Sequence, residues 1–190
     1  MLTIRVEAVS GHYRVPGNVE QSGIAPTFAV APPSTVRGFL ESLCGSTCGS
    51  FEGEFAYGWL RDPQGYGLLH RRVQVWASGG MKPRLERNRT INVEMLFDVA
   101  YAVAVRGPWA DRVRAALEGD VERFGVLYLG ESTDLVTWIA PLNGDASNGV
   151  RWVVPGTSLR LPVVSGRGYD SITAAYGTFD IREGEPAWHH

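Results

Sequence analysis

The chain has 190 residues, of which 44% are hydrophobic and 20% are charged. This composition supports a folded core and argues against a disordered chain. The net charge of -2 excludes a general affinity for nucleic acid, so any basic surface must be local. All basic residues except Lys82 are Arg, a bias that favours bidentate phosphate contacts but that a GC-rich genome also produces.

The two cysteines, Cys44 and Cys48, have no second Cys or His pair at zinc-ligand spacing, which argues against a zinc site. Residues 1–7 alternate apolar and polar side chains and do not resemble a signal peptide, and no apolar run approaches the ~20 residues of a membrane span. We therefore expect a cytoplasmic protein that does not associate with a membrane and that binds no metal or cofactor. The final pair, His189 and His190, could be native or the remains of a purification tag.

The chain opens with alternating residues 2–8, which predict a strand that is buried on one face. Residues 10–26 lose this periodicity and contain several glycines and prolines. They predict a long loop of the kind that is often functional, and this loop carries His12, Tyr13 and Arg14.

A helix is expected next. Pro32 and Pro33 keep the chain extended, after which Ser34 or Thr35 can cap the first turn, and Gly45 suits the position just beyond the helix end. Apolar residues form one stripe of this helix: Val36, Phe39, Leu40 and Leu43. Its N-terminus combines free backbone donors, two hydroxyls and Arg37, which would suit a phosphate, although an ordinary capped core helix explains the same residues.

Strands are expected over residues 55–60 and 68–77. Residues 78–89 hold four basic residues against one acid and are broken by Gly and Pro, so they predict an exposed basic loop. Two strands follow, over 91–97 and over 99–105, separated by Asp98.

A second helix should begin at Pro108 and end at Gly119, with Arg114 paired to Glu118. Residues 124–129 predict another strand. The last third has short strand patterns separated by turn residues, over residues 135–140, 150–154, 159–164 and 172–181.

Up to residue 129 the element order is β, α, β, β, an extra hairpin pair, α, β. This is the order of a split βαβ fold with an insertion, in which helices cover one face of the sheet. We therefore predict the α+β class, with a ferredoxin-like (RRM-like) domain over residues 1–130 and a small β-rich domain over residues 131–190. The inserted hairpin, or thumb, is expected at about residues 78–90.

Three segments of the chain resemble the CRISPR-associated family five proteins of the RAMP superfamily. They are residues 31–38 (APPSTVRG), which open the first helix, the Arg-rich residues 82–89, which lead into the strand over 92–97, and residues 127–132 (LYLGES). The resemblance implies an RNA-binding subunit of the type I effector complex Cascade, which grips the 5′ handle of the CRISPR RNA and caps the adjoining backbone subunits. The implied partners are this RNA, the backbone and large subunits, and target DNA through the complex.

Binding a single RNA strand requires phosphate ligands and surfaces on which unpaired bases can stack. The candidate RNA-binding residues are Arg14, Ser34, Arg37, Arg71, Lys82, Arg84, Arg87, Arg89 and Arg167. Tyr13, Trp76 and Tyr169 are candidates for stacking. The plainer alternatives are a solvated hairpin face for the basic segment, core packing for Tyr13 and Trp76, and a plain turn for Gly166-Arg167-Gly168.

Some relatives cut precursor RNA without a metal, which requires a general base, a general acid and a cation. In this chain Pro83, not His, follows Lys82, and the other candidates are scattered: His12, Tyr13, Tyr57 and His70. We therefore expect a protein with no catalytic residues, and keep a metal-independent endoribonuclease as the alternative. A third possibility is a module that binds a protein or a small molecule on the same fold.

Overall fold

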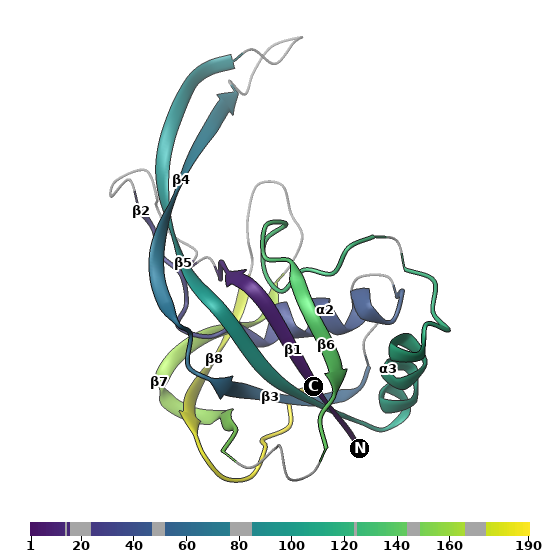
Figure 1. Ribbon diagram of the computed structural model, residues 1–190. Coiled ribbons are helices and arrows are strands. Elements are labelled where there is room, and N and C mark those ends of the chain that lie inside the picture. Colours follow the sequence, from purple (N-terminus) through teal and green to yellow (C-terminus); the bar gives the residue numbers. More distant parts are fainter. Residues whose placement is uncertain are drawn as a thin grey trace.

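The computed structural model describes residues 1–13, 15, 24–46, 52–76, 85–123, 125–143, 149–165 and 174–190. In this part of the chain one eight-stranded sheet is combined with two helices (Figure 1), so the predicted α+β class is confirmed. The strands are β1 (Leu2–Gly11), β2 (Ile24–Ala25), β3 (Glu54–Arg61), β4 (Gly65–Trp76), β5 (Leu85–Arg106), β6 (Val136–Pro141), β7 (Arg151–Ser165) and β8 (Ala174–Arg182). The helices are α2 (Pro33–Leu43) and α3 (Pro108–Glu118).

The strands follow one another across the sheet in the order β6-β1-β5-β3-β7-β8, and all of these pairs are antiparallel. Two further strands, β2 and β4, pair with β5. Both helices pack on the same core as the inward side chains of β1 and β5, which include Ile4 and Val103. The sheet contains strands from both predicted domains, and the division at residue 130 stays a prediction.

The start of α2 differs from the prediction that Ser34 or Thr35 caps it. Pro32 is the N-cap, no side chain caps the helix, and the Pro32 carbonyl accepts hydrogen bonds from the N–H groups of Thr35 (2.9 Å) and Val36 (3.2 Å). The reason is the ring of Pro33, which sets a helical φ at the first helical position and lets the helix begin earlier. The predicted apolar stripe is confirmed: Val36, Phe39, Leu40 and Leu43 are buried.

The end of α2 confirms the prediction for Gly45, which has a left-handed φ of 62°. The Gly45 N–H donates to the Ser42 carbonyl (3.2 Å), and the Ser46 N–H donates to the Glu41 carbonyl (2.9 Å). This pair of bonds is a Schellman motif, which satisfies carbonyls at the end of the helix.

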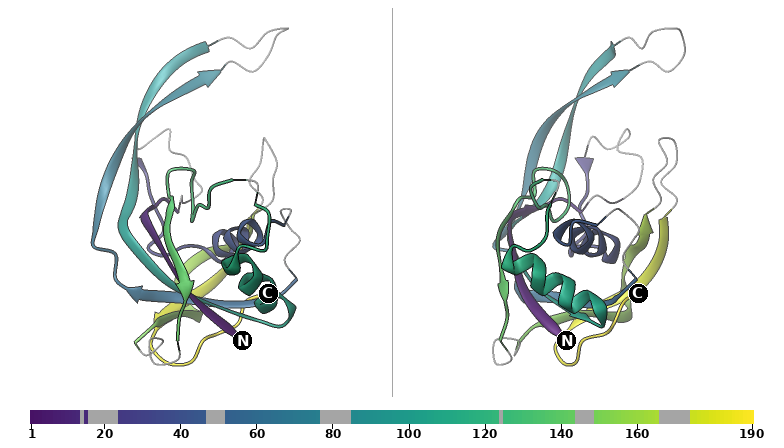
Figure 2. Two further views of the ribbon diagram at one scale, coloured as in Figure 1. Left: turned by 45° about the vertical axis from the view of Figure 1, so that its right-hand side comes forward. Right: turned by 90° about the vertical axis from the view of Figure 1, so that its right-hand side faces the viewer.

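A long two-stranded hairpin extends away from the rest of the sheet (Figure 1, Figure 2). It consists of β4 and residues 85–97 of β5, and we call it the arm. The predicted basic loop over 78–89 is therefore wrong in its second part, because β5 already begins at Leu85. Residues 86–90 are all polar or charged, so this part of the sequence has no apolar–polar alternation from which a strand could be predicted.

The two strands predicted on either side of Asp98 form the single strand β5. Asp98 has a left-handed φ of 53°, and its carboxylate forms an ion pair with Arg61. At this point β5 exchanges one neighbour for another, because its earlier residues pair with β4 and its later residues pair with β3. The irregular residue allows the strand to continue through the change, as β-bulges do elsewhere.

Several predictions in the second half need correction. Of the strand predicted over 124–129, residues 125–129 contribute one isolated bridge, between Tyr128 and Leu135, and the strand that pairs with β1 is β6. Arg114 pairs with Asp111 (2.6 Å) instead of Glu118. The strands predicted over 150–154 and 159–164 are joined in β7, with an irregularity between Pro155 and Leu159.

Candidate nucleic-acid interface

Three of the basic residues that the sequence singled out lie on the strands of the arm: Arg71, Arg87 and Arg89. The stretch of sequence over residues 65–97, which includes both strands of the arm, has six basic residues and two acidic ones, a charge of +4 in a chain with a net charge of -2. The register of the arm places Arg87 opposite Val75 and Arg89 opposite Val73. Four predicted site residues lie outside the described residues: Arg14, Lys82, Arg84 and Arg167.

Arg71 connects the arm to the body of the protein. Its guanidinium forms an ion pair with Glu131, and its Nη2 also donates to the Thr133 hydroxyl at 3.2 Å. The Arg71 side chain is 30% exposed. It therefore has a structural partner in this protein, and its contact with RNA stays a prediction.

Ser34 and Arg37 lie in the first turns of α2, where both are half-buried. The Nε of Arg37 lies 3.8 Å from the Glu41 carboxylate, one turn along the helix. The segment before them is held inside the core, because the Ala31 N–H donates to the Tyr101 hydroxyl (2.9 Å) and the Tyr57 hydroxyl donates to the Ala31 carbonyl (2.8 Å). Burial raises the pKa of both tyrosines, so they stay neutral hydrogen-bonding groups. In this structure the role of Ala31, Pro32 and Pro33 is to position the start of α2.

A buried cluster around Asp134 fixes the chain where β1 ends. Asp134 is fully buried and accepts hydrogen bonds from the Ser10 hydroxyl (2.8 Å), the His12 backbone N–H (2.8 Å) and the Glu131 backbone N–H (2.7 Å). The His12 ring also contacts this carboxylate through Nδ1. Burial alone would raise the pKa of Asp134, but these hydrogen bonds outweigh it and hold the pKa below its usual value. Asp134 is thus a charged anchor for two loops.

The orientation of the His12 ring by Asp134 is how many enzymes orient an imidazole base. In this structure, however, His12 is only 3% exposed, and its Nε2 is buried without a hydrogen-bond partner in the described part of the chain. A base must come within hydrogen-bond distance of the proton that it removes. The arrangement therefore favours a structural role for His12.

Of the three aromatic residues expected to stack on bases, Tyr13 has a side chain in the described part of the structure. Tyr13 is 2% exposed and packs edge-on against Tyr101, with ring centroids 6.4 Å apart, so core packing is its role. Tyr169 and the Trp76 side chain are outside the described part of the structure.

The sequence reasoning missed an exposed face of β4 formed by Tyr66, Leu68 and His70. Tyr66 is 71% exposed, Leu68 is 59% exposed, and His70 is also exposed. These residues alternate with the less exposed Gly67 and Leu69, as expected for one face of a strand. The signal was the alternation itself, but the predicted strand began at residue 68 and so left Tyr66 out.

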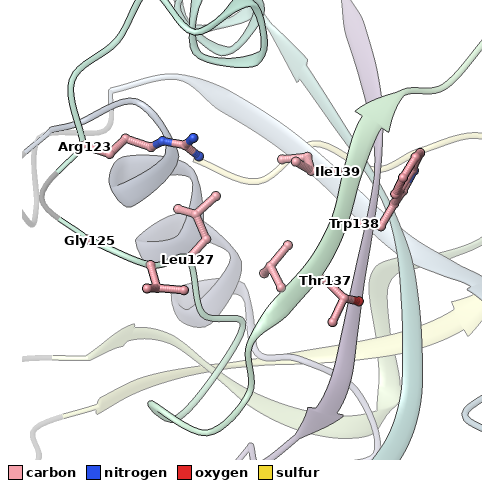
Figure 3. A pocket seen from close by; sticks show the side chains of 8 residues that line it. Arg123, Gly125, Leu127, Thr137, Trp138 and Ile139 are labelled. Carbon is pink, nitrogen blue, oxygen red and sulfur yellow. The ribbon is translucent and has the colours of Figure 1, made fainter.

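A groove of about 260 Å³ lies between β6 on one side and Arg123 with residues 125–127 on the other (Figure 3). Leu127 and Ile139 point into it from its two sides, and Arg123 extends across one end (Figure 3). The chain just before Arg123 carries the exposed carboxylates Glu118, Asp120 and Glu122. Arg123 is the one charged side chain among the described residues that line the groove.

Within the described residues, no group of three or more His, Cys, Asp or Glu side chains is arranged to hold a metal ion. In the same part of the chain, neither α2 nor α3 could span a membrane.

No protein-family model matches this chain, and no curated protein matches it. Its fold is similar to that of a chain in a solved structure described as "CRISPR RNA-guided surveillance complex", with a TM-score of 0.68 and 16% identity, over 98% of this chain and 90% of that chain. A structure described as "Crystal structure of Cas protein" matches with a TM-score of 0.46 and 14% identity, over 95% and 93% of the two chains. A "Type III-B Cmr-beta bound to cognate target RNA and AMPPnP" matches with a TM-score of 0.40 and 9% identity, over 70% and 61%. At these identities the first likeness establishes the fold, and the two lower scores carry no further argument.

Proposed function

We propose that this chain is a non-catalytic RNA-binding subunit of a type I Cascade effector complex, where it grips the 5′ handle of the CRISPR RNA and caps the backbone subunits. The observation that carries this proposal is the arm, a projecting hairpin that lies in a stretch of sequence, residues 65–97, with a charge of +4 in a mildly acidic chain. A local basic extension of this kind is what binding to a phosphate backbone requires.

The topology supports the ferredoxin-like part of this proposal. The strands β1, β3, β5 and β6 alternate with the two helices along the chain in the order β-α-β-β-α-β, and they lie in the sheet in the order β6-β1-β5-β3. This is the arrangement of a split βαβ fold, with the arm inserted between its second and third strands. The fold likeness to a chain of a "CRISPR RNA-guided surveillance complex" agrees with the proposal of a Cascade subunit.

The proposed partners are the CRISPR RNA and the backbone and large subunits, with target DNA reached only through the complex. Four large apolar side chains near the groove are exposed: Val126, Tyr128, Leu135 and Trp138. Exposed apolar surface is common in proteins that assemble with others. It therefore agrees with a subunit of a larger particle.

The first prediction concerns the charge of the arm. Reversing Arg87 and Arg89 together to Glu should weaken binding to a labelled 5′-handle RNA by about 100-fold or more, because each contact between Arg and phosphate is a charge-assisted hydrogen bond. The matched control reverses Arg112 and Arg114 to Glu, since both are exposed on α3 and the change in net charge is the same. Fluorescence anisotropy at several salt concentrations measures both affinities.

For the unchanged protein we expect log Kd to rise with log salt by about 0.7 per neutralised phosphate. The arm variant should show a smaller slope, and the α3 variant should keep the original one. Equal RNA affinity of the two variants would remove the arm from the proposal. RNA binding that does not depend on salt would contradict the proposal as a whole.

The alternative function is metal-independent cleavage of the precursor RNA, and the contact between His12 and Asp134 is the observation in its favour. Incubation with a repeat RNA in EDTA tests it. We expect no specific cleavage, because the His12 ring is buried. Specific cleavage that His12→Ala or His70→Ala abolishes would establish the nuclease in place of the non-catalytic role.

A further inference from the structure

The exposed face of β4 is unusual for a strand of a soluble protein, because it presents two large side chains and an aromatic His to solvent. Tyr66 and Leu68 are 71% and 59% exposed, and His70 follows on the same face. Exposed apolar groups that lie side by side mark binding surfaces more often than scattered ones do. This face of β4 therefore has the character of a binding surface.

The opposite face of β4 is covered in part by Phe97. A side chain in place of Gly67 would meet the Phe97 ring, since an added Cβ would lie only 2.4 Å from that ring. Phe97 thus covers Gly67 on one face of β4. Tyr66 and Leu68, the chain neighbours of Gly67, point to the opposite face. The His70 ring is held by a hydrogen bond from Nδ1–H to the Asn92 side-chain oxygen (2.5 Å) on the neighbouring strand. The aromatic groups are attached to a paired strand and not to a loop.

The charge of the arm indicates what occupies this face. The hairpin has an excess of four positive charges over residues 65–97, and Glu94, the acid that lies opposite Leu68, accepts a hydrogen bond from the Thr27 N–H (3.2 Å) on the other side of β5. An aromatic platform on a basic hairpin is complementary to single-stranded nucleic acid, because the bases stack on rings while the phosphates meet guanidinium groups. A protein partner would need an acidic surface to match the same hairpin.

We propose that Tyr66, with Leu68 and His70 beside it, is a platform on which an unpaired base of the bound RNA stacks. This inference rests on the proposed function and adds to it the residues that contact a base, whereas the arginines contact phosphates. Stacking is tolerant of sequence, because every base has a flat face. The platform would therefore hold a nucleotide without reading its identity.

The test compares three substitutions of Tyr66 with the unchanged protein. Tyr66→Ala and Tyr66→Leu should weaken binding to the handle RNA by about 5- to 150-fold, the range expected for loss of one stacked base. Tyr66→Phe should bind within about twofold of the unchanged protein, because it keeps the ring. The Leu variant is the sharper control, since it keeps apolar bulk without aromaticity. None of the three variants should alter the salt slope, because Tyr66 neutralises no phosphate.

An RNA series with one abasic nucleotide at each position identifies the stacked base. At one position the abasic RNA should bind the unchanged protein and Tyr66→Ala equally, because the same contact is lost in both cases. Normal binding by Tyr66→Ala, with steep salt dependence retained, would overturn the platform and leave the proposed function standing. Failure of the unchanged protein to bind RNA would instead overturn the proposed function. Loss of a protein partner in Tyr66→Ala at normal RNA affinity would assign the face to protein docking and overturn the platform.

Discussion

His189, which the sequence could not distinguish from a tag residue, is part of the folded protein. Its backbone N–H donates to the Phe55 carbonyl (2.7 Å), and its carbonyl accepts from the Phe55 N–H (3.0 Å). Its ring lies 5.4–5.5 Å from the rings of Phe55, Tyr57 and Phe179, and its Nε2–H donates to the Val153 carbonyl (3.2 Å). A residue with these contacts contributes to the packing of the sheet.

Burial lowers the pKa of His189 below its ordinary value, more than the bond to Val153 raises it, and the neighbouring His190 lowers it further. The unfolded chain, with a His pKa of about 6.5, then binds a proton at a higher pH than the folded chain does. The stability that depends on neutral His189 is therefore complete above about pH 6.5 and is lost as the pH falls from there toward the folded pKa.

The second prediction follows from this sign. His189→Phe keeps a ring in the same place but cannot be protonated, so the free energy of unfolding should lose a dependence on pH of up to about 1.4 kcal/mol per pH unit just below pH 6.5. Urea unfolding at several pH values measures this, and His190→Phe, a change at an exposed neighbour that makes the smallest contribution to the pKa shift, should keep most of the pH dependence. Identical pH profiles for all three proteins would show that His189 is not buried as described.

At the scale of one element, the ends of the two helices show which features local sequence determines and which features tertiary contacts determine. Gly45 and Gly119 both follow a helix and both have a left-handed φ, of 62° and 89°. An added Cβ at Gly45 would lie 2.3 Å from the Glu122 carbonyl, whereas an added Cβ at Gly119 would meet nothing within 4 Å. The sequence predicts both helix ends, but only the fold makes one of them a point of close approach.

The third prediction uses this matched pair. Gly119→Ala should lower the free energy of unfolding by about 1–2 kcal/mol, the cost of a left-handed conformation for a residue with a Cβ. Gly45→Ala should lower it by clearly more, because the chain at Glu122 must also move. Gly38→Ala, in the exposed middle of α2 with open space around it, should instead raise it by about 0.5–1 kcal/mol. Urea unfolding compares all three, and equal losses for the two end variants would contradict the close approach.

At the scale of the whole molecule, strands from the two ends of the chain complete one core. β6 pairs with β1 and β7 pairs with β3, while Val153, Leu161 and Phe179 pack in the same core as Ile4 and the helices. A piece that lacked the last strands would expose these contacts to water. Burial of shared apolar surface makes such segments fold together.

The fourth prediction is therefore a single cooperative unfolding transition for the whole chain. Far-ultraviolet circular dichroism, which reports on the sheet and helices, should give the same midpoint as tryptophan fluorescence, to which the buried Trp59, Trp109 and Trp152 contribute. A chain ending at residue 130 should fail to fold by itself. Two separate transitions, or a folded 130-residue piece, would support independent domains divided at residue 130.

The sequence by itself determined the local features of this protein. Alternation marked β1, apolar spacing and the flanking Pro and Gly marked both helices, and an excess of basic residues marked residues 78–89 as the basic segment. These signals depend on neighbouring residues, and a single chain contains them. The sequence also limited the fold class, because the predicted helices and strands follow one another in the order of a split βαβ fold.

Only the tertiary structure decided which strands are neighbours and which side chains are covered. It joined the two strands around Asp98 into β5, replaced the strand predicted over 124–129 by β6, and gave Arg71 a partner in Glu131. It also buried Tyr13 and exposed Tyr66. The physical reason is that pairing and burial depend on residues far apart in sequence, so a tyrosine in the core and a tyrosine at the surface have the same local pattern.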